Sequence, residues 1–316
     1  MPFVRRFLTL AAAAAVVFAQ QDTKPKDPKK DPDQIGNREV DKGLNWYSIE
    51  KEMALGKGFA QILAQQSQII DDPVISEYVN RLGQNLARNS DSKFPLTIKV
   101  RRDESPNAIS LPGGFFFVNT GLILTAASEA ELAGGMAHEI AHIAARHATR
   151  TMTRQQVGQL ATIPLIFMGG WAGYGARQGV SAGMPFAFLR FDRAFEAEAD
   201  MLGLEYLYKS GYDPNGMVDI FEKLDALNKK KPGRMAGWLS DHPLTTDRIV
   251  TAQKNIQELL KSRPEYVETT SEFNAVRARL AAMERKQKIG PLDDPNRPTL
   301  RRAPDKNMAL AAAAAE

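Results

Sequence analysis

Apolar residues recur at helical spacing over most of the stretch between residues 43 and 262. The apolar stripe of the first predicted helix consists of Ile49, Met53, Phe59 and Leu63. A second helix is predicted to begin after Asp72, because aspartate caps helix N-termini and the proline that follows suits the first helical position.

A short stretch inside this region has the pattern of strands instead. Residues 96–101 alternate between apolar and polar side chains, which is the period of a half-buried strand. Residues 107–110 and 114–119 are interpreted as two further strands around a Pro-Gly-Gly turn, so we expect a small antiparallel sheet. Helical patterns then return. The predicted fold class is α+β, a mainly helical domain over residues 43–262 with a small antiparallel sheet.

The N-terminal residues differ from this domain. Residues 1–19 combine Arg5 and Arg6 with an uncharged apolar run that ends in small residues, which predicts a cleaved signal peptide. A permanent membrane anchor is the alternative, although the run is shorter than the roughly 20 residues that span a bilayer. Both interpretations put the domain outside the cytoplasm, so we expect a periplasmic or secreted protein.

Three further segments flank the domain. Residues 20–42 are rich in Lys, Asp and Pro and are expected to form a disordered linker that buries almost nothing. Residues 263–289 are expected to form a helical extension, and residues 290–316 a disordered tail. The apolar stripe of the extension consists of Phe273, Val276, Leu280 and Met283.

Composition narrows the possible chemistry. The 316 residues include no cysteine, which excludes disulfides, thiolate metal ligands and cysteine nucleophiles. The formal net charge of +4 is small for this length, so no nucleic-acid partner is expected.

The strongest chemical signal is an H-E-x-x-H motif formed by His138, Glu139 and His142, and a capping box just before it predicts a helix. On a helix the two histidines lie about 40° apart, so both imidazoles can bind one Zn²⁺. Glu139 is then free to act as the general base on the metal-bound water. His147 lies about 180° around the helix from His138, so a core or helix-end role is expected for it.

A catalytic zinc needs a third protein ligand, and the acidic segment 192–200 offers two candidates, Glu196 and Glu198. Glu196 shares a helix face with Asp200, whereas Glu198 points about 160° away from Asp200 and is expected to be solvated. We therefore predict Glu196 as the ligand and Asp200 as the carboxylate that orients one imidazole. A solvated acidic helix face is the alternative.

Taken together, these motifs resemble those of the gluzincin metallopeptidases, which include the CAAX prenyl proteases, the heat-shock membrane protease and the periplasmic β-barrel assembly-enhancing protease. The resemblance covers about residues 49–249 and rests on segments in the family's order. These segments are 106–108, 111–114, 118–122, 129–142, 196–200 and 241–243, with Arg248. The resemblance implies a zincin-type domain with one Zn²⁺ per chain and supports Glu196 as the third ligand.

The resemblance also implies roles for residues that spacing alone leaves open. His242 would be a reversible fourth ligand that gates the open position of the zinc, and Arg248 would stabilise the oxyanion or the substrate. A plain loop histidine before a proline is the alternative for His242. The residues implied as the cleft edge, to which an extended substrate adds as a strand, are Gly114, Phe115, Phe116 and Phe117. An ordinary Phe-rich core strand is the alternative there.

Two features depart from the family pattern. Gly134 and Gly135 stand where the family usually has Ala or Val, at a helix-propensity cost of about 1 kcal/mol each. Close packing of the Glu196 helix near Gly135 is the expected reason. The long helical-repeat module that follows the catalytic domain in the β-barrel assembly protease does not appear in this sequence, so docking of partners through such repeats is not carried over.

Residues 155–176 are uncharged and apolar but interrupted by glycines and a proline. We expect a mobile lid or membrane-facing loop over the cleft, which would make contact with a membrane surface, and a true membrane span is the alternative.

The expected function is that of an extracytoplasmic zinc metalloendopeptidase. Its expected substrates are unfolded or misfolded envelope polypeptides, outer-membrane proteins among them, in protein quality control. The alternative from another class is a zinc-stabilised, chaperone-like protein that binds unfolded strands and cuts slowly or never.

Overall fold

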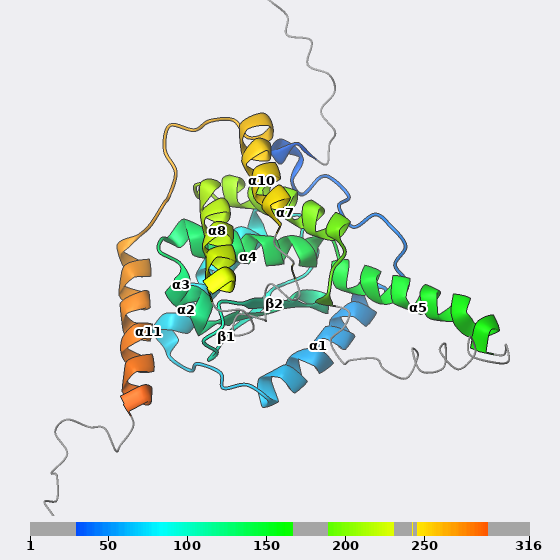
Figure 1. The fold of residues 1–316 in the computed structure, drawn as a ribbon, viewed down its shortest axis with the longest axis horizontal. Coiled ribbons are helices and arrows are strands. Elements are labelled where there is room, and N and C mark those ends of the chain that lie inside the picture. The colour runs from blue at the N-terminus through cyan, green and yellow to red at the C-terminus, as the bar shows by residue number, and fades with distance from the viewer. Residues whose placement is uncertain (1–29, 167–188, 231–241, 243–244, 290–316) are drawn as a thin grey trace, which may run out of the picture.

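The computed structural model describes residues 30–166, 189–230, 242 and 245–289, and in these residues helices predominate around one small sheet (Figure 1). The helices are α1 (Ile49–Gln65), α2 (Pro73–Arg88), α3 (Thr120–Thr125), α4 (Glu129–Ala144), α5 (His147–Ile166), α7 (Arg193–Lys209), α8 (Asn215–Lys230), α10 (Thr246–Leu259) and α11 (Ser271–Ile289). The strands are β1 (Thr97–Arg101), β2 (Ala108–Leu111) and β3 (Phe115–Asn119), and two 3-10 turns are η2 (Pro32–Gln34) and η3 (Pro112–Gly114). The α+β class, mainly helical with a small sheet, is confirmed.

The sheet has the strand order β1-β3-β2 and is mixed. β2 and β3 pair antiparallel, as expected, with Ser110 opposite Phe116. β1 instead pairs parallel with β3, with Thr97 opposite Phe115, so the expectation of a purely antiparallel sheet is wrong for this pair. The tight η3 turn forces β2 and β3 to run in opposite directions, and β1 then occupies the other side of β3. β3 is therefore the central strand.

Side chains of β3 alternate between two apolar layers, as the pleat of a strand requires. Phe116 and Val118 belong to the main core with α2 and α4, whereas Phe117 packs with Ala60 and Leu63 of α1. The sheet thus lies between α1 and α4 (Figure 1).

Helix α4 is buried along its whole length and forms the centre of the domain. Its predicted cap is present, because the Ser128 hydroxyl accepts a hydrogen bond from the Glu131 backbone N–H at 3.2 Å. The Glu131 carboxylate in turn accepts one from the Ala127 N–H at 2.8 Å, which completes the start of the helix. α7 and α8 pack against α4, and α7 lies on the side of α4 away from the sheet (Figure 1).

Close approach of the helices explains one of the two adjacent glycines in α4. A Cβ on Gly134 would lie 2.6 Å from the Cα of Met217 in α8, so only glycine fits. A Cβ on Gly135 would meet only the Leu122 side chain, at 3.6 Å. The expected packing of the Glu196 helix near Gly135 is therefore wrong, and α7 makes its own close approach elsewhere, where a Cβ on Gly203 would lie 3.1 Å from the Cα of His138.

Residues 30–42 lie against the domain, in contrast to the expected linker that buries almost nothing. Val40 is 3% exposed and belongs to the main core. The Arg38 Nε donates to Asp91 at 2.9 Å, and its guanidinium also pairs with Glu205 of α7. The segment is held by a buried cation between two buried carboxylates, and no local apolar pattern signals such a contact.

Within the predicted helical extension 263–289, residues 263–270 are not helical and only Ser271–Ile289 forms a helix, α11. Its side chains Phe273, Val276 and Leu280 are almost fully buried in the main core, and Met283 packs against it. The helix lies beside α2 and α3 and so shares the core of the domain.

Several expectations fall outside the described residues: the signal peptide at 1–19, the tail at 290–316, and the part of 155–176 beyond Ile166. The part of that segment up to Ile166 belongs to α5. Among the described residues no helix is long and apolar enough to cross a membrane.

Candidate metal centre

Helices α4 and α7 bring three metal-binding side chains together in the protein interior. His138 and His142 lie one turn apart on α4, and Glu196 lies in the first turn of α7. The side chain of Asp192 accepts a hydrogen bond from the Phe195 N–H at 2.9 Å and caps α7 as predicted. The three donor residues are at most 2% exposed.

The spacing of the donor atoms fits a zinc ion. The Nε2 atoms of His138 and His142 are 3.1 Å apart. Oxygens of Glu196 lie 3.5 Å from the His138 nitrogen and 3.6 Å from the His142 nitrogen. Because zinc bonds of about 2.0–2.1 Å in a tetrahedral site put the ligand atoms about 3.3 Å from each other, these residues fit Zn²⁺.

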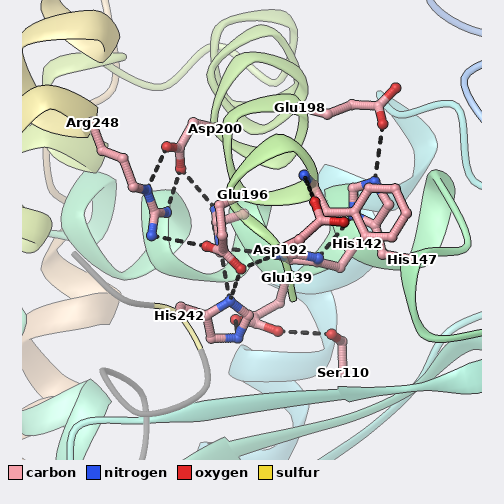
Figure 2. A network of polar contacts seen from close by, with 12 residues as sticks. Ser110, Glu139, His142, His147, Asp192, Glu196, Glu198, Asp200, His242 and Arg248 are labelled. Atoms are coloured by element: carbon pink, nitrogen blue, oxygen red, sulfur yellow. Dashed lines mark hydrogen bonds and ion pairs between the residues drawn. The ribbon is translucent and has the colours of Figure 1, made fainter. Parts of the chain in front are cut away.

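His242 adds a fourth nitrogen to this cluster. Its Nδ1 lies 2.8 Å from Glu196 Oε1 and 3.3 Å from His138 Nε2, and the four donor atoms lie within 4.8 Å of one another. Its Nε2 lies 3.2 Å from Glu139 Oε1. The ring therefore sits between the metal ligands and the glutamate of the H-E-x-x-H motif (Figure 2).

Glu139 is fully buried and faces the sheet. Its Oε2 accepts a hydrogen bond of 2.7 Å from the Ser110 hydroxyl of β2 (Figure 2). Glu139, Ser110 and His242 line one small hollow together with Ile109 and Phe191. The sequence analysis did not single out Ser110, because nothing in the pattern of a short strand marks a residue that contacts a helix 29 positions later.

A carboxylate and an arginine support His138 on the side of its Nδ1, away from the other metal ligands. Asp200 Oδ1 lies 3.0 Å from His138 Nδ1, which is the contact predicted for it. Arg248 donates to both oxygens of Asp200, at 2.7 and 2.8 Å. Its third nitrogen lies 2.8 Å from Glu196 Oε2, so one guanidinium joins both carboxylates (Figure 2).

The charges and the burial of the cluster favour the binding of a cation there. Burial acts to raise the pKa of Glu196, but the surrounding histidines outweigh it and hold that pKa well below its usual value. Burial lowers the pKa of His142 well below its usual value, so this ring is neutral, as a ligand must be. Burial also opposes the charge on His138, yet hydrogen bonds to Asp200 and Glu196 raise its pKa to about 9.

Comparison with known proteins agrees with this geometry. The profile of peptidase family M48 matches residues 73–256, which is more than half of the chain. The chain belongs to peptidase family M48. With the buried His/His/Glu/His cluster, it is a zinc metallopeptidase of that family.

Three relatives show how far the similarity extends. The beta-barrel assembly-enhancing protease of Escherichia coli is 32% identical over 246 residues, covering 75% of this chain and 49% of the relative. The putative beta-barrel assembly-enhancing protease of Vibrio cholerae is 34% identical over 245 residues, covering 74% and 49%. The mitochondrial metalloendopeptidase OMA1 of Schizosaccharomyces pombe is 32% identical over 177 residues, covering 54% and 50%. The chain thus spans about half the length of these relatives.

The fold of this M48 peptidase contradicts one predicted site element. β3 cannot receive a substrate strand, because β1 and β2 pair with it on both sides. The expected cleft edge at Gly114, Phe115, Phe116 and Phe117 is therefore wrong, and these residues instead support the core. Among the described strands, β2 is the edge that lies against the metal centre.

His147 is fully buried at the start of a helix, as its expected core or helix-end role requires, but its position and that of Glu198 differ from the helical-wheel expectation. α4 ends at Ala144, and His147 begins a new helix with its Nδ1 2.9 Å from the Nδ1 of His142. Glu198 is not solvated as expected, because its carboxylate lies 3.1 Å from His147 Nε2 and 3.3 Å from Arg150 Nη1. The angle of 180° between His147 and His138 assumed one continuous helix, and no glycine or proline marks the break. The expectation for Glu198 considered its own helix alone and could not show that α5 lies beside it.

Proposed function

We propose that this M48 peptidase cleaves peptide bonds in unfolded or misfolded envelope polypeptides outside the cytoplasm. The observation that carries the proposal is the buried cluster of His138, His142 and Glu196 beside Glu139 and β2, which is an edge strand among the described residues. The predicted signal peptide supports the location. The similarity to beta-barrel assembly-enhancing proteases supports outer-membrane proteins as a substrate class.

In this proposal His138, His142 and Glu196 hold the zinc ion, and Glu139 moves the proton. Zinc, when bound there, would polarise a carbonyl oxygen and would lower the pKa of water at the site to about 7. Glu139 takes a proton from the attacking water and passes it to the leaving amine. The hydrogen bond from Ser110 fixes one oxygen of Glu139, which leaves the other turned toward His242 and the metal ligands.

We further propose β2 as the strand that receives the substrate. β2 is paired only with β3 among the described strands, so the main chain of its outer side can add an extended peptide. Ser110 places this edge within one hydrogen bond of Glu139. Docking through main-chain hydrogen bonds is largely independent of sequence, as clearance of unfolded chains requires.

His242 is proposed to gate the site, because its Nδ1 occupies the fourth corner of the donor cluster. Replacement by alanine should raise the proteolytic rate or lower the zinc affinity. If His242→Ala leaves both unchanged, the gating role is wrong. Arg248 is proposed to hold Asp200 and Glu196 in place and to stabilise the oxyanion or the substrate from that position.

The same position of His242 favours a second candidate function. A ring that stays over the metal ligands would block the site, and the protein would then bind unfolded strands with little or no cleavage.

Casein digestion separates the two functions. Wild type and Glu139→Gln should both bind one zinc per chain, and only the wild type should cleave. Equal cleavage by the two proteins refutes the role of Glu139. Zinc binding without cleavage in either protein favours the chaperone-like function, and His242→Ala would then be expected to start cleavage.

A further inference from the structure

We propose that His147, backed by Glu198 and Arg150, is a positioning residue for the metal ligand His142. It would hold His142 through the ring nitrogen that faces away from the metal. The inference rests on the proposed metal site and adds to it residues with no donor atom in the cluster.

The backbone is shaped to bring His147 to this place. Arg146 has a φ of 56°, the left-handed conformation that non-glycine residues rarely adopt. Arg146 is held there by Glu52, whose carboxylate accepts from its Nε at 2.7 Å, and by the Tyr47 carbonyl, which accepts from its Nη2 at 2.6 Å. In an unbroken helix His147 would lie about 140° around from His142, where the rings cannot meet. The left-handed backbone of Arg146 therefore brings the His147 ring next to Nδ1 of His142.

Hydrogen bonding fixes the roles of the ring nitrogens. When His142 binds metal through Nε2, its Nδ1 carries a proton and can donate to His147 Nδ1, 2.9 Å away. His147 must then carry its own proton on Nε2, which lies 3.1 Å from Glu198 Oε2. Arg150 lies 3.3 Å from the same oxygen and balances its charge. The result is a line from the metal ligand through a second imidazole to a carboxylate and an arginine.

Aromatic packing leaves the two rings little freedom to rotate. His147 stacks on Phe195 with ring centres 4.2 Å apart, and His142 stacks on Phe191 at 4.1 Å. The His147 ring is fully buried. A second imidazole between ligand and carboxylate lets Glu198 support His142 from a site on α7 that it could not reach directly.

The other metal-binding histidine has an equivalent support. His138 Nδ1 meets Asp200, which pairs with Arg248. Each histidine is thus backed by a carboxylate of α7 and an arginine, and the line behind His142 is longer by one ring. Such partners orient metal ligands, and their loss typically costs about 10- to 100-fold in metal affinity.

The test measures zinc affinity by competition with a chromophoric chelator, together with the visible spectrum of the Co²⁺ form. His147→Phe keeps the ring stack and removes the nitrogens, so it should weaken zinc binding about 10- to 100-fold and alter the Co²⁺ spectrum. His147→Asn places an amide oxygen where Nδ1 lies, so it should remain within a few-fold of wild type. Glu198→Gln should fall between them.

Glu205→Gln is the matched control, because Glu205 is also a buried carboxylate of α7 paired with an arginine. It should leave the zinc affinity and the Co²⁺ spectrum unchanged, whatever it does to metal-free stability. The inference is overturned if His147→Phe binds zinc like wild type, or if Phe, Asn and the control all weaken binding in proportion to lost stability. Failure of wild type itself to bind zinc would overturn the proposed function and this inference with it.

Discussion

Alanine substitutions at the two adjacent glycines of α4 are predicted to change the stability of the protein in opposite directions. Gly134 faces α8, and an added Cβ would lie 2.6 Å from the Cα and 2.8 Å from the N of Met217. Backbone atoms cannot rotate away, so Gly134→Ala must push α8 from α4. At Gly135 the added methyl would meet only Leu122 side-chain carbons, at 3.6 and 3.8 Å, which is ordinary contact.

The magnitudes follow from helix propensity and packing. Alanine is about 1 kcal/mol more favourable than glycine inside a helix, so Gly135→Ala should stabilise the protein by up to about 1 kcal/mol. Gly134→Ala has the same gain, but overpacking against a rigid neighbour costs about 1–3 kcal/mol or more. We therefore expect a net loss of up to about 2 kcal/mol, and a larger one if α8 shifts as a unit.

Denaturant unfolding of both variants, each metal-free, measures this difference directly. The free energies of unfolding should change in opposite directions relative to wild type. If Gly134→Ala is as stable as Gly135→Ala, the close contact between α4 and α8 is wrong.

The remaining predictions concern charge and metal. Arg248→Gln should lower zinc affinity about 10- to 100-fold in a chelator competition, and Arg248→Lys should not restore it, because lysine lacks the planar fork that spans Asp200 and Glu196. Burial raises the pKa of Glu205 from 4.5 to about 7 against the opposing charge of Arg38. The folded state therefore holds this proton more tightly, so about 3 kcal/mol of stability present below pH 4.5 should be lost as pH rises through 7. Glu205→Gln should flatten that part of the stability curve, and an unchanged slope refutes the raised pKa. At a free zinc concentration of 1000 times its Kd, bound zinc should stabilise the folded protein by about 4 kcal/mol. Removing the zinc with a chelator should therefore lower the unfolding temperature. An unfolding temperature that does not respond to chelator would contradict a zinc site.

Local signals predicted the helices that carry the site. Ser128 and Asp192 cap α4 and α7 as their side chains suggest, and helical spacing then puts the two histidines on one face. Spacing on one helix also puts Asp200 on the same face as Glu196, and that face lies against His138. These features depend on neighbours within one turn, which the sequence displays directly.

Contacts between distant segments could not be predicted in this way. The parallel pairing of β1 with β3 depends on which side of β3 remains free after β2 has turned back. The break before His147 depends on Glu52, 94 positions upstream of the arginine it holds. Helix periodicity carries no information on such partners, so the strand order and the line behind His142 appear only in three dimensions.

The anchored segment before α1 has a consequence for how the chain can be shortened. A version beginning at residue 43 would lose Val40 from the main core and would leave Asp91 and Glu205 facing each other in the interior without Arg38. Loss of this cation would leave the two carboxyl groups without their shared partner and would weaken the attachment of α7, the helix that also carries Glu196. Trimming at the N-terminal side would therefore lower the stability of the helix that supports the metal centre.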